Sequence, residues 1–339
     1  LVLKTCIQKA PSTAFAGQEI ILEGKNFVPG GLFGGSSVTE VLVNNLPLHP
    51  DQILEISNQK IKLRTPNTPG NYLFRVKVAY GGRVSISNAV SIQIVPPPVQ
   101  PPEISAIVNG ASFDLNQPLA PGTIFSLFGK NLGEAEKAKG FPLPRKLGGA
   151  RITICGREAP LLVNTGPLNR PEGKIWQING IVPNLATSSP CEVVVSIEAN
   201  SLSATAKRTV KISLSPEETL AIFTFPALSE KGNQVQLPII TNQQGQLIVP
   251  PQTSIPGTNP SFFTQANPCE IITLWTTGGG RTVPLVPDGE PAPSQPLSLM
   301  EKTPIVQIYG MDAEVLFAGL APGFSGLYQI NTRVPCEAT

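Results

Sequence analysis

The residues that could carry out catalysis are few and lie far apart. The chain of 339 residues has one histidine, His49, between a leucine and a proline where a strand is expected to turn. No Gly-x-Ser-x-Gly elbow occurs, and the flanks of Gly323-Phe-Ser-Gly326 are typical of a β-turn rather than of a strand, elbow and helix. We therefore interpret His49 as a surface turn residue rather than a triad base, and we assign no catalytic residue.

Two further segments contain residues that bind phosphate or metal in other proteins. Gly278-Gly-Gly-Arg-Thr282 lacks the lysine and the following helix of a phosphate loop, so we expect a mobile loop between strands. Asp288 and Glu290 supply two carboxylates, whereas a calcium ion takes about six to eight oxygen ligands. The distance between the two acids of a glycoside hydrolase depends on the folded structure, and nothing in the sequence indicates such a pair. No metal and no cofactor is assigned.

The two tryptophans are candidate platforms for a sugar ring. Trp176 and Trp275 both fall at inward-facing positions of expected strands, and Trp176 occupies the position that Tyr328 has in a second copy of the same motif. A role in the core is therefore preferred to a role in sugar stacking.

The five cysteines are far apart and form no C-x-x-C pair, which argues against a zinc or thioredoxin-like site. In an exported β-protein we expect disulfides between Cys155 and Cys191 and between Cys269 and Cys336. Each pair flanks the strands of one module, although five cysteines allow about fifteen ways to form two bonds. Cys6 is then left over, either for an intermolecular bond or as a buried thiol. Reduced thiols in a cytosolic protein are the alternative.

Composition limits the class of protein. Charged residues make up 14% of the chain, glycine and proline together 31 + 36 = 67 residues, and apolar residues 41%. This favours short strands joined by many turns over long helices or disorder. The net charge of +2 predicts no nucleic-acid partner, and no apolar stretch approaches the ~20 residues of a membrane helix. The first residue is Leu1, which predicts a trimmed N-terminus such as a removed signal peptide leaves.

Three ordered copies of one strand pattern run along the chain. An alternating apolar strand that ends in glycine comes first, followed by a strand with a tight turn, and then by a strand that ends near a proline. The first strand occupies 16–27, 121–132 and 268–279; the second, 41–48, 152–159 and 306–313; the third, 61–66, 176–183 and 328–335. We therefore predict an all-β chain of three tandem immunoglobulin-like sandwiches.

The module boundaries follow from these copies. Module one is residues 1–97, a proline-rich linker covers 98–102, module two is residues 103–222, and module three is residues 223–339. This linker is part of a proline-rich run from Pro96 to Pro102, which predicts a separable first module. Modules two and three have no such spacer and are expected to pack together. We also expect a hairpin of 235–240 with 246–249, and helix only at 131–139.

Module one resembles the IPT/TIG class of immunoglobulin-like domains. The resemblance rests on Ala16-Gly17, Gly24-Lys-Asn-Phe27, Thr65-Pro66 and Gly70. It implies a β-sandwich of about 95 residues and assigns no catalytic chemistry.

Residues 103–335 are similar to the C-terminal module of uncharacterised secreted proteins of soil acidobacteria. The resemblance rests on six short motifs that span modules two and three: Val108-Asn-Gly-Ala-Ser-Phe113, Ala120-Pro-Gly122, Phe128-Gly-Lys-Asn-Leu132, Leu143-Pro144 with Leu147-Gly-Gly149, Gln177-Ile-Asn179 with Val182-Pro183, and Gly319-Leu-Ala-Pro-Gly323 with Gly326-Leu-Tyr-Gln-Ile-Asn331. It implies export and an accessory or surface role. Members of that group continue past the last Val-Pro with another hairpin, whereas this chain ends at Thr339.

Counting residues after the third strand predicts an incomplete third module. Module one continues for 29 residues from Pro66 to Val95, module two for 29 from Pro183 to Ile212, and module three for four after Pro335. Either the sequence is part of a longer chain or a strand from a neighbouring molecule completes the sandwich. For the second case we expect an open edge along Gly326–Val334, with Leu327, Tyr328, Ile330 and Val334 receiving the foreign strand.

These features together predict a non-catalytic extracellular structural or adhesive protein. It is expected to assemble head-to-tail as a fibre by strand addition, with a homo-oligomer as the main assembly and a surface polysaccharide as a further partner. The alternatives are an accessory region of a larger secreted protein, which binds carbohydrate or spaces domains, and a secreted hydrolase with an unrecognised site.

Overall fold

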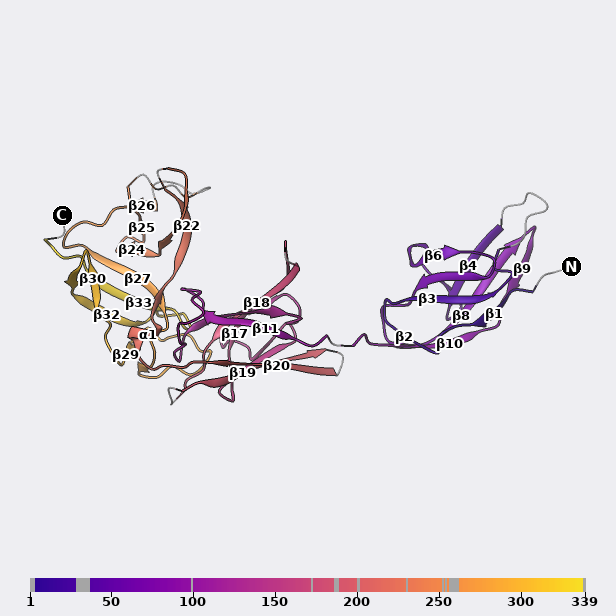
Figure 1. Ribbon diagram of the computed structural model, residues 1–339, viewed down its shortest axis with the longest axis horizontal. Coiled ribbons are helices and arrows are strands. Elements are labelled where there is room, and N and C mark those ends of the chain that lie inside the picture. Colours follow the sequence, from indigo (N-terminus) through magenta and orange to yellow (C-terminus); the bar gives the residue numbers. More distant parts are fainter. Residues whose placement is uncertain are drawn as a thin grey trace. The chain divides into compact units, whose positions relative to one another are not determined.

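The computed structural model describes the chain except residues 1–3, 29–36, 99, 172, 186–188, 200–201, 230, 252, 254, 256–261 and 338–339. Almost all regular structure in the described part is β-strand, which confirms the all-β prediction (Figure 1). The chain divides into two compact units, Leu1–Pro98 and Val99–Thr339. The boundary falls within the proline-rich segment, and modules two and three belong to the same unit.

The first unit is a sandwich of two sheets around one core of apolar side chains. One sheet has the strand order β1-β3-β7-β6 and the other β2-β10-β8-β4-β5, with β9 paired to β8. The elements are β1 (Cys6–Lys9), β2 (Thr13–Phe15), β3 (Glu19–Lys25), β4 (Ser37–Val43), β5 (Leu46–Pro47), the 3-10 helix η1 (Pro50–Gln52), β6 (Ile53–Ile56), β7 (Lys60–Arg64), β8 (Gly70–Tyr80), β9 (Arg83–Ile86) and β10 (Val90–Val95).

Module two has the same two-layer arrangement. Its sheets have the orders β11-β12-β18-β17-β13 and β14-β15-β19-β20, with β16 paired to β15, and they enclose a continuous apolar core. The elements are β11 (Glu103–Asn109), β12 (Ile124–Lys130), β13 (Glu136–Lys137), β14 (Lys146–Leu147), β15 (Ala150–Ile154), β16 (Arg157–Glu158), β17 (Leu161–Arg170), β18 (Gly173–Ile181), β19 (Cys191–Ala199), β20 (Leu202–Val210) and the one-turn helix α1 (Pro216–Thr219).

Module three consists mainly of one large sheet of order β26-β25-β24-β27-β33-β32-β29-β28, to which β21 adds by pairing with β27. Two separate hairpins, β22–β23 and β30–β31, complete it. The elements are β21 (Ala221–Ile222), β22 (Thr224–Leu228), β23 (Gln234–Pro238), β24 (Ile240–Asn242), β25 (Leu247–Ile248), β26 (Phe263–Thr264), β27 (Ile271–Thr277), β28 (Thr282–Val283), β29 (Leu299–Met300), β30 (Val306–Ile308), β31 (Met311–Ala313), β32 (Val315–Leu320) and β33 (Tyr328–Arg333).

The expected hairpin of module three is present in a shorter form. β24 pairs with β25 around the turn that ends at Gly245, as predicted, but β23 pairs with β22 instead. The sequence pattern located the turn and merged two strands that belong to different hairpins.

The Gly-Lys-Asn motif of modules one and two has a structural cause. A Cβ on Gly24 would collide with the carbonyl oxygen of Cys6, and one on Gly129 would collide with that of Glu103. Asn26 and Asn131 follow with φ values of 60° and 54°, a left-handed conformation that asparagine tolerates better than most residues. The motif therefore brings two strands close together and then turns the chain.

The prediction of a helix at 131–139 is wrong. Asn131 and Gly133 are left-handed, and Glu136–Lys137 forms β13, which pairs with Val163 and Asn164 of β17. A segment this short is marginal as an isolated helix, so pairing with an existing strand outweighs its helix propensity. In the described part of the chain, α1 and η1 are the helical elements.

Buried polar side chains join module two to module three. The Thr277 hydroxyl accepts from the Ile124 backbone N–H at 2.8 Å and donates to the Gly326 carbonyl at 2.8 Å. The Asn109 amide donates to the Thr219 carbonyl at 2.9 Å, and the Thr219 hydroxyl donates to the Gly278 carbonyl at 2.7 Å. Because a buried polar group without a partner is costly, this network holds the two modules in one arrangement.

Candidate functional site

His49 lies where the sequence placed it, in a surface turn. It caps η1, its Nδ1 accepts from the Asp51 backbone N–H at 3.4 Å, and its side chain is 71% exposed. The ring also lies 3.3 Å from the Asp51 carboxylate. This geometry fits a turn residue and gives the histidine no nucleophile to activate.

The carboxylates Asp288 and Glu290 do not form a calcium site. Asp288 accepts from the Asn184 backbone N–H at 2.8 Å and lies 3.6 Å from the Arg157 guanidinium. Its oxygens are therefore used to hold a loop of module three against module two. Across the described residues, no group of three or more His, Cys, Asp or Glu is placed to hold a metal ion.

The expectation of a mobile loop at Gly278–Thr282 is wrong. Gly278, Gly279 and Gly280 are buried at the junction of modules two and three. A Cβ on Gly278 would collide with the Thr219 carbonyl oxygen, and one on Gly279 would lie 2.5 Å from the Tyr328 ring. The Tyr328 hydroxyl donates to the Gly280 carbonyl, and complete burial raises the pKa of that hydroxyl far above its ordinary value. The glycines are required for close packing, not for motion.

Both tryptophans are committed to internal contacts. The Trp176 indole N–H donates to the Gly133 carbonyl at 2.7 Å, and the ring packs on the core of module two. The Trp275 indole N–H donates to the Thr241 hydroxyl at 3.1 Å. Trp275 is half-buried and lies on the face of β27 opposite Ile272 and Leu274, across from Gln329, so the expectation that it faces the core is wrong.

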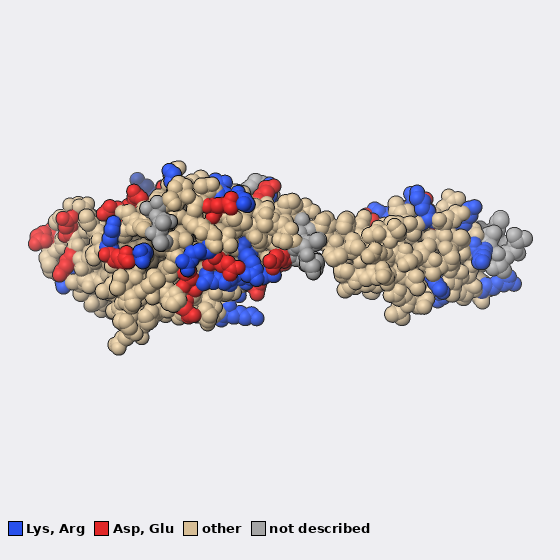
Figure 2. All heavy atoms as spheres, turned by 90° about the horizontal axis from the view of Figure 1, so that it is seen from below, with Lys and Arg blue, Asp and Glu red and all other residues tan. Residues whose placement is uncertain are grey.

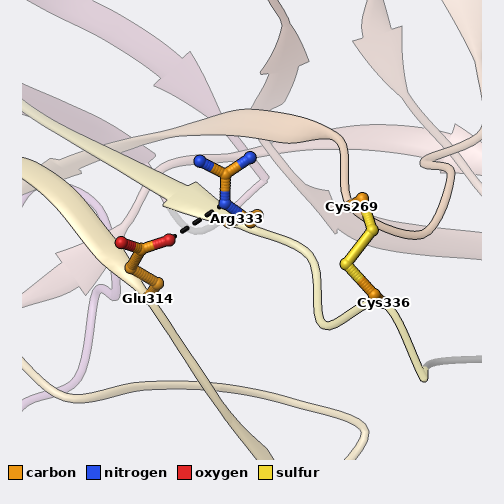
Figure 3. Close-up of a disulfide and its surroundings, with 4 residues drawn as sticks. All are labelled: Cys269, Glu314, Arg333 and Cys336. Atoms are coloured by element: carbon orange, nitrogen blue, oxygen red, sulfur yellow. Dashed lines mark hydrogen bonds and ion pairs between the residues drawn. A yellow bond between two sulfur atoms is a disulfide. The ribbon is translucent and has the colours of Figure 1, made fainter.

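The structure contains the disulfides Cys155–Cys191 and Cys269–Cys336, the two pairs expected from the sequence. Their Cα atoms are 5.2 and 4.5 Å apart, within the usual range for a disulfide. Figure 3 shows Cys269–Cys336 just beyond the end of β33, where Arg333 also contacts Glu314. Cys6 is free and half-buried.

The repeated Gln-Ile-Asn motif aligns modules two and three residue by residue. Gln177 donates to Asn179 at 2.9 Å in β18, and Gln329 donates to Asn331 at 2.9 Å in β33. Each asparagine also accepts, at 3.0 Å, from a hydroxyl directly across the neighbouring strand, Ser126 in β12 or Thr273 in β27. The motif is a structural amide ladder, and it shows that β12 and β18 correspond to β27 and β33.

The predicted open edge at Gly326–Val334 is not present. β33 lies inside its sheet, paired with β27 on one side and β32 on the other. The backbone of Leu327 pairs with Ala321, and that of Val334 with Cys269 and Glu270. The side chains of Tyr328 and Ile330 are buried. A foreign strand therefore has no place beside these four residues, and the expectation of a fibre joint there is wrong.

Module three instead has an apolar groove over one face of its sheet. β27 and β33 form the floor, the β30 segment forms one wall, and residues of β24, β25 and the following loop form the other. The groove has a volume of about 790 Å³. The side chains that line it include Ile240, Ile248, Ile272, Leu274, Ile308 and Ile330. Of the described lining residues, Tyr309 alone has an ionisable side chain.

The groove wall at β30 is the feature that sequence reasoning missed. The missing final hairpin was expected to pair along residues 326–334. In module two, however, the final hairpin β19–β20 pairs with β15 and not with β18. The strand equivalent to β15 is β30, because 152–159 and 306–313 are the same repeat element. The alignment needed to find it was therefore present, and only the order of strands in the sheet was unknown.

The face in Figure 2 is mostly uncharged. Over the unit of modules two and three, lysine and arginine are mixed there with aspartate and glutamate. This agrees with the small net charge of the sequence. Within the described residues, no helix is long and apolar enough to cross a membrane.

Comparison with known proteins identifies the first module. Residues 6–94 match the family model of the IPT/TIG domain, which confirms the resemblance found in module one. The similarity of residues 103–335 to the acidobacterial module stays a prediction. A search of curated proteins found no match.

Several solved structures resemble the chain at low identity. They include a chimeric titin Z1Z2 carrying an exogenous decorin peptide, with 12% identity, 63% of this chain and 99% of that chain covered, and a TM-score of 0.25. The adhesin InvE of Yersinia pseudotuberculosis has 12% identity, 76% and 74% coverage, and a TM-score of 0.28. The protein SGBP-B of the Bacteroides ovatus mixed-linkage glucan utilization locus, solved with a mixed-linkage heptasaccharide, has 13% identity, 94% and 69% coverage, and a TM-score of 0.20. These likenesses concern the fold alone.

Proposed function

We propose that this chain is a non-catalytic extracellular protein with a structural or adhesive role, and that it binds a partner in the apolar groove of module three. The observation that carries the proposal is the chemistry of the groove lining. It offers apolar side chains and an amide or hydroxyl at a few positions, with Tyr309 as the one ionisable group among the described lining residues. Such a surface can bind by desolvation, and Tyr309 is its one described side chain that could exchange a proton.

The two disulfides support an extracellular location. Bonds of this kind persist in secreted and surface proteins and are rare in reducing compartments. The free Cys6 belongs to the IPT/TIG domain and takes part in neither bond. Head-to-tail fibre assembly is not part of the proposal, because the strand β33 that was to accept a neighbour is already paired on both edges.

A second candidate function, an accessory region that spaces other domains, is favoured by one observation. The IPT/TIG unit and the unit formed by modules two and three meet at the proline-rich segment between Pro96 and Pro102. Proline-rich segments act as semi-rigid spacers. Limited proteolysis that cuts first in this segment and leaves two folded fragments would support the spacer role.

A turnover screen tests the absence of catalysis. The intact chain is incubated with a panel of polysaccharides and esters, and released product is measured against a His49→Ala variant that retains every groove residue. We expect no product above the buffer blank for either protein. Turnover that copurifies with the chain and is abolished by one substitution would overturn the proposal.

Binding of a fluorescent apolar dye tests the groove itself. We expect the dye signal of the intact chain to fall several-fold in Ile308→Asp, because Ile308 lies in the groove wall and a carboxylate there disfavours apolar ligands. Ile86→Asp is the matched control, since Ile86 is 47% exposed on β9 of the IPT/TIG domain. Equal loss of signal in the two variants would show that the dye binds without preference for the groove.

A further inference from the structure

The outer edge of β30 lacks the strand partner that its equivalents have. β30 pairs with β31 and with no other described strand. In that pairing, Ile308 with Met311 and Val306 with Ala313 are the hydrogen-bonded pairs. Gln307 lies between them, so its backbone N–H and C=O point away from β31, toward the open edge of β30. No described group accepts a hydrogen bond from the Tyr309 backbone N–H.

The three modules share the turn that follows this strand. Tyr309-Gly310 has φ values of 53° and 76°, Cys155-Gly156 has 50° and 77°, and Asn44-Asn45 has 52° and 67°. Two consecutive left-handed residues define a two-residue hairpin turn that sets the register of its strands. Ile308 therefore corresponds to Ile154 in module two and to Val43 in module one.

In modules one and two a strand covers the edge that is open in module three. β8 pairs antiparallel with β4, placing Phe74 opposite Val43 and Val76 opposite Val41. β19 pairs antiparallel with β15, placing Val193 opposite Ile154 and Val195 opposite Ile152.

The turn itself also receives a hydrogen bond from the covering strand. The Asn44 N–H donates to the Leu73 carbonyl at 2.9 Å, and the Cys155 N–H donates to the Glu192 carbonyl at 3.0 Å. Tyr309, at the equivalent position, has no such bond to a described residue.

The covering strand has the same chemistry in both complete modules. Its residues at alternate positions are apolar and at most 6% exposed: Phe74, Val76 and Val78 in β8, and Val193, Val195 and Ile197 in β19. In module three, the equivalent space is the groove, whose floor is apolar and whose wall is exposed at Ile305, 79%, and Tyr309, 88%. The fold thus offers both the backbone edge and the apolar face that such a strand requires.

We propose that the groove binds an extended β-strand of a partner polypeptide, which runs antiparallel to β30. The partner's apolar residues at i, i+2 and i+4 lie opposite Ile308, Val306 and Pro304, and its residue i+1 exchanges backbone hydrogen bonds with Gln307. This inference rests on the proposed binding role of the groove and specifies the ligand as a strand with alternating apolar residues. A small apolar molecule would use the floor but not the open backbone edge.

The chain supplies its own probe for this site. A synthetic peptide of residues 70–80 contains the β8 strand, with Phe74, Val76 and Val78 at i, i+2 and i+4 and with Arg75 and Lys77 to keep it soluble. We expect it to bind the intact 339-residue chain with one-to-one stoichiometry by calorimetry. The same peptide with Val76→Asp is expected to bind at least about tenfold more weakly, because a carboxylate would enter the apolar floor.

N-methylated peptides separate strand pairing from general apolar binding. The Arg75 N–H faces β4 in module one, whereas the Val76 N–H faces away and donates to the Ser87 hydroxyl at 2.9 Å. Methylation of the peptide at Arg75 should therefore weaken binding about tenfold, and methylation at Val76 less than about threefold. Equal effects of the two methyl groups would overturn the proposed pairing with β30.

Variants of the chain give the reciprocal test. Gln307→Pro removes the N–H on the open edge of β30 without touching the bonds to β31, and we expect binding to weaken about tenfold. Gln307→Ala keeps that N–H and should change binding less than about threefold. Tryptophan fluorescence during urea unfolding shows whether each variant is folded, since both tryptophans lie in the unit that carries the groove.

Three results would overturn the inference. The first is no peptide binding by a folded chain that binds the apolar dye, which would assign the groove to small molecules. The second is self-association that Ile308→Asp abolishes and Gln307→Pro leaves unchanged, which would make an apolar face of a second copy, and not a strand, the occupant. The third is a native polypeptide that continues past Thr339 and fills the groove itself. Catalytic turnover, in contrast, would remove the proposed function and leave peptide binding unchanged.

Discussion

Modules two and three each contain a sheet with the same pair of central strands, and the two sheets differ in what covers them. In module two, Leu127 and Ile178 on β12 and β18 are fully buried beneath the second sheet, which contains β15, β19 and β20. In module three, the equivalent Leu274 and Ile330 form the floor of an apolar groove, and β30–β31 is the part of the second sheet that the described residues supply. Module two is a closed sandwich, whereas in module three the buried core that contains Leu274 and Ile330 borders an open apolar groove.

The comparison shows how a sheet with a partly uncovered face is kept in place. The polar junction with module two and the disulfide Cys269–Cys336 hold β27 and β33 at both ends of the groove (Figure 3). The amide ladder of Gln329 and Asn331 supports the opposite face of the sheet. Since these restraints do not pass through the groove, the groove can accept a ligand without loss of the fold.

Matched substitutions in the two walls give the largest expected difference. Ile154→Ala removes a fully buried side chain and should lower the free energy of unfolding by about 2–5 kcal/mol. Ile308→Ala, at the equivalent half-buried position, should cost less than about 1 kcal/mol. Urea unfolding followed by tryptophan fluorescence measures both. Equal losses would mean that the groove is already filled in the isolated chain.

Removal of each disulfide compares the covalent restraints of the two modules. The bonds close loops with sequence separations of 36 and 67 residues. We expect Cys155→Ala with Cys191→Ala, and Cys269→Ala with Cys336→Ala, each to lower the free energy of unfolding by about 2–4 kcal/mol. The second pair should cost about half a kcal/mol more, because its loop is longer. Cys6→Ala is the control, with no bond to lose; no loss from the second pair would contradict its role in module three.

Two glycines with left-handed backbone conformations compare the packing at the junction of modules two and three with the packing around the β30–β31 turn. Gly278 and Gly310 have φ values of 85° and 76°, but a Cβ on Gly278 would strike the Thr219 carbonyl whereas Gly310 has open space around it. Gly310→Ala should cost about 1 kcal/mol from backbone strain alone. Gly278→Ala should cost clearly more, measured by the same unfolding assay. A smaller loss at Gly278 would show that the junction can move apart.

Alkaline titration tests a single side chain, that of Tyr328. Burial raises its pKa in the folded chain above the ordinary value of about 10, so the folded state keeps its proton while the unfolded state loses it. This contribution to stability is complete below about pH 10 and is lost as the pH rises above it, by about 1 kcal/mol at pH 11. Unfolding at pH 9 and pH 11 should show this loss, and Tyr328→Phe should remove it. An unchanged pH dependence in Tyr328→Phe would contradict the assignment.

Local patterns in the sequence were sufficient for several features. The alternation of apolar residues in β3 and β12 predicted strands, and the repeated Gly-Lys-Asn and Gln-Ile-Asn motifs predicted equivalent strands in different modules. The cysteine pairs follow from the same alignment, because each pair lies at the ends of strands that the repeats already placed. The residues 131–139 show the limit, since their helix propensity was outweighed by a pairing with β17 that no local pattern reveals.

What the sequence by itself determined is the all-β type of the chain, the order and repetition of the strands in the three copies, and the alternation of inward and outward side chains along most of them. These depend on periodicity within a few neighbouring residues. What only the tertiary structure decided is which strand lies beside which. The count of residues after Pro335 predicted an open strand edge and assigned it to β33. The order of strands in the sheets of module two shows that the equivalent edge is that of β30. Strand neighbours are set by contacts between residues far apart in the chain, and a count along the sequence has no access to them.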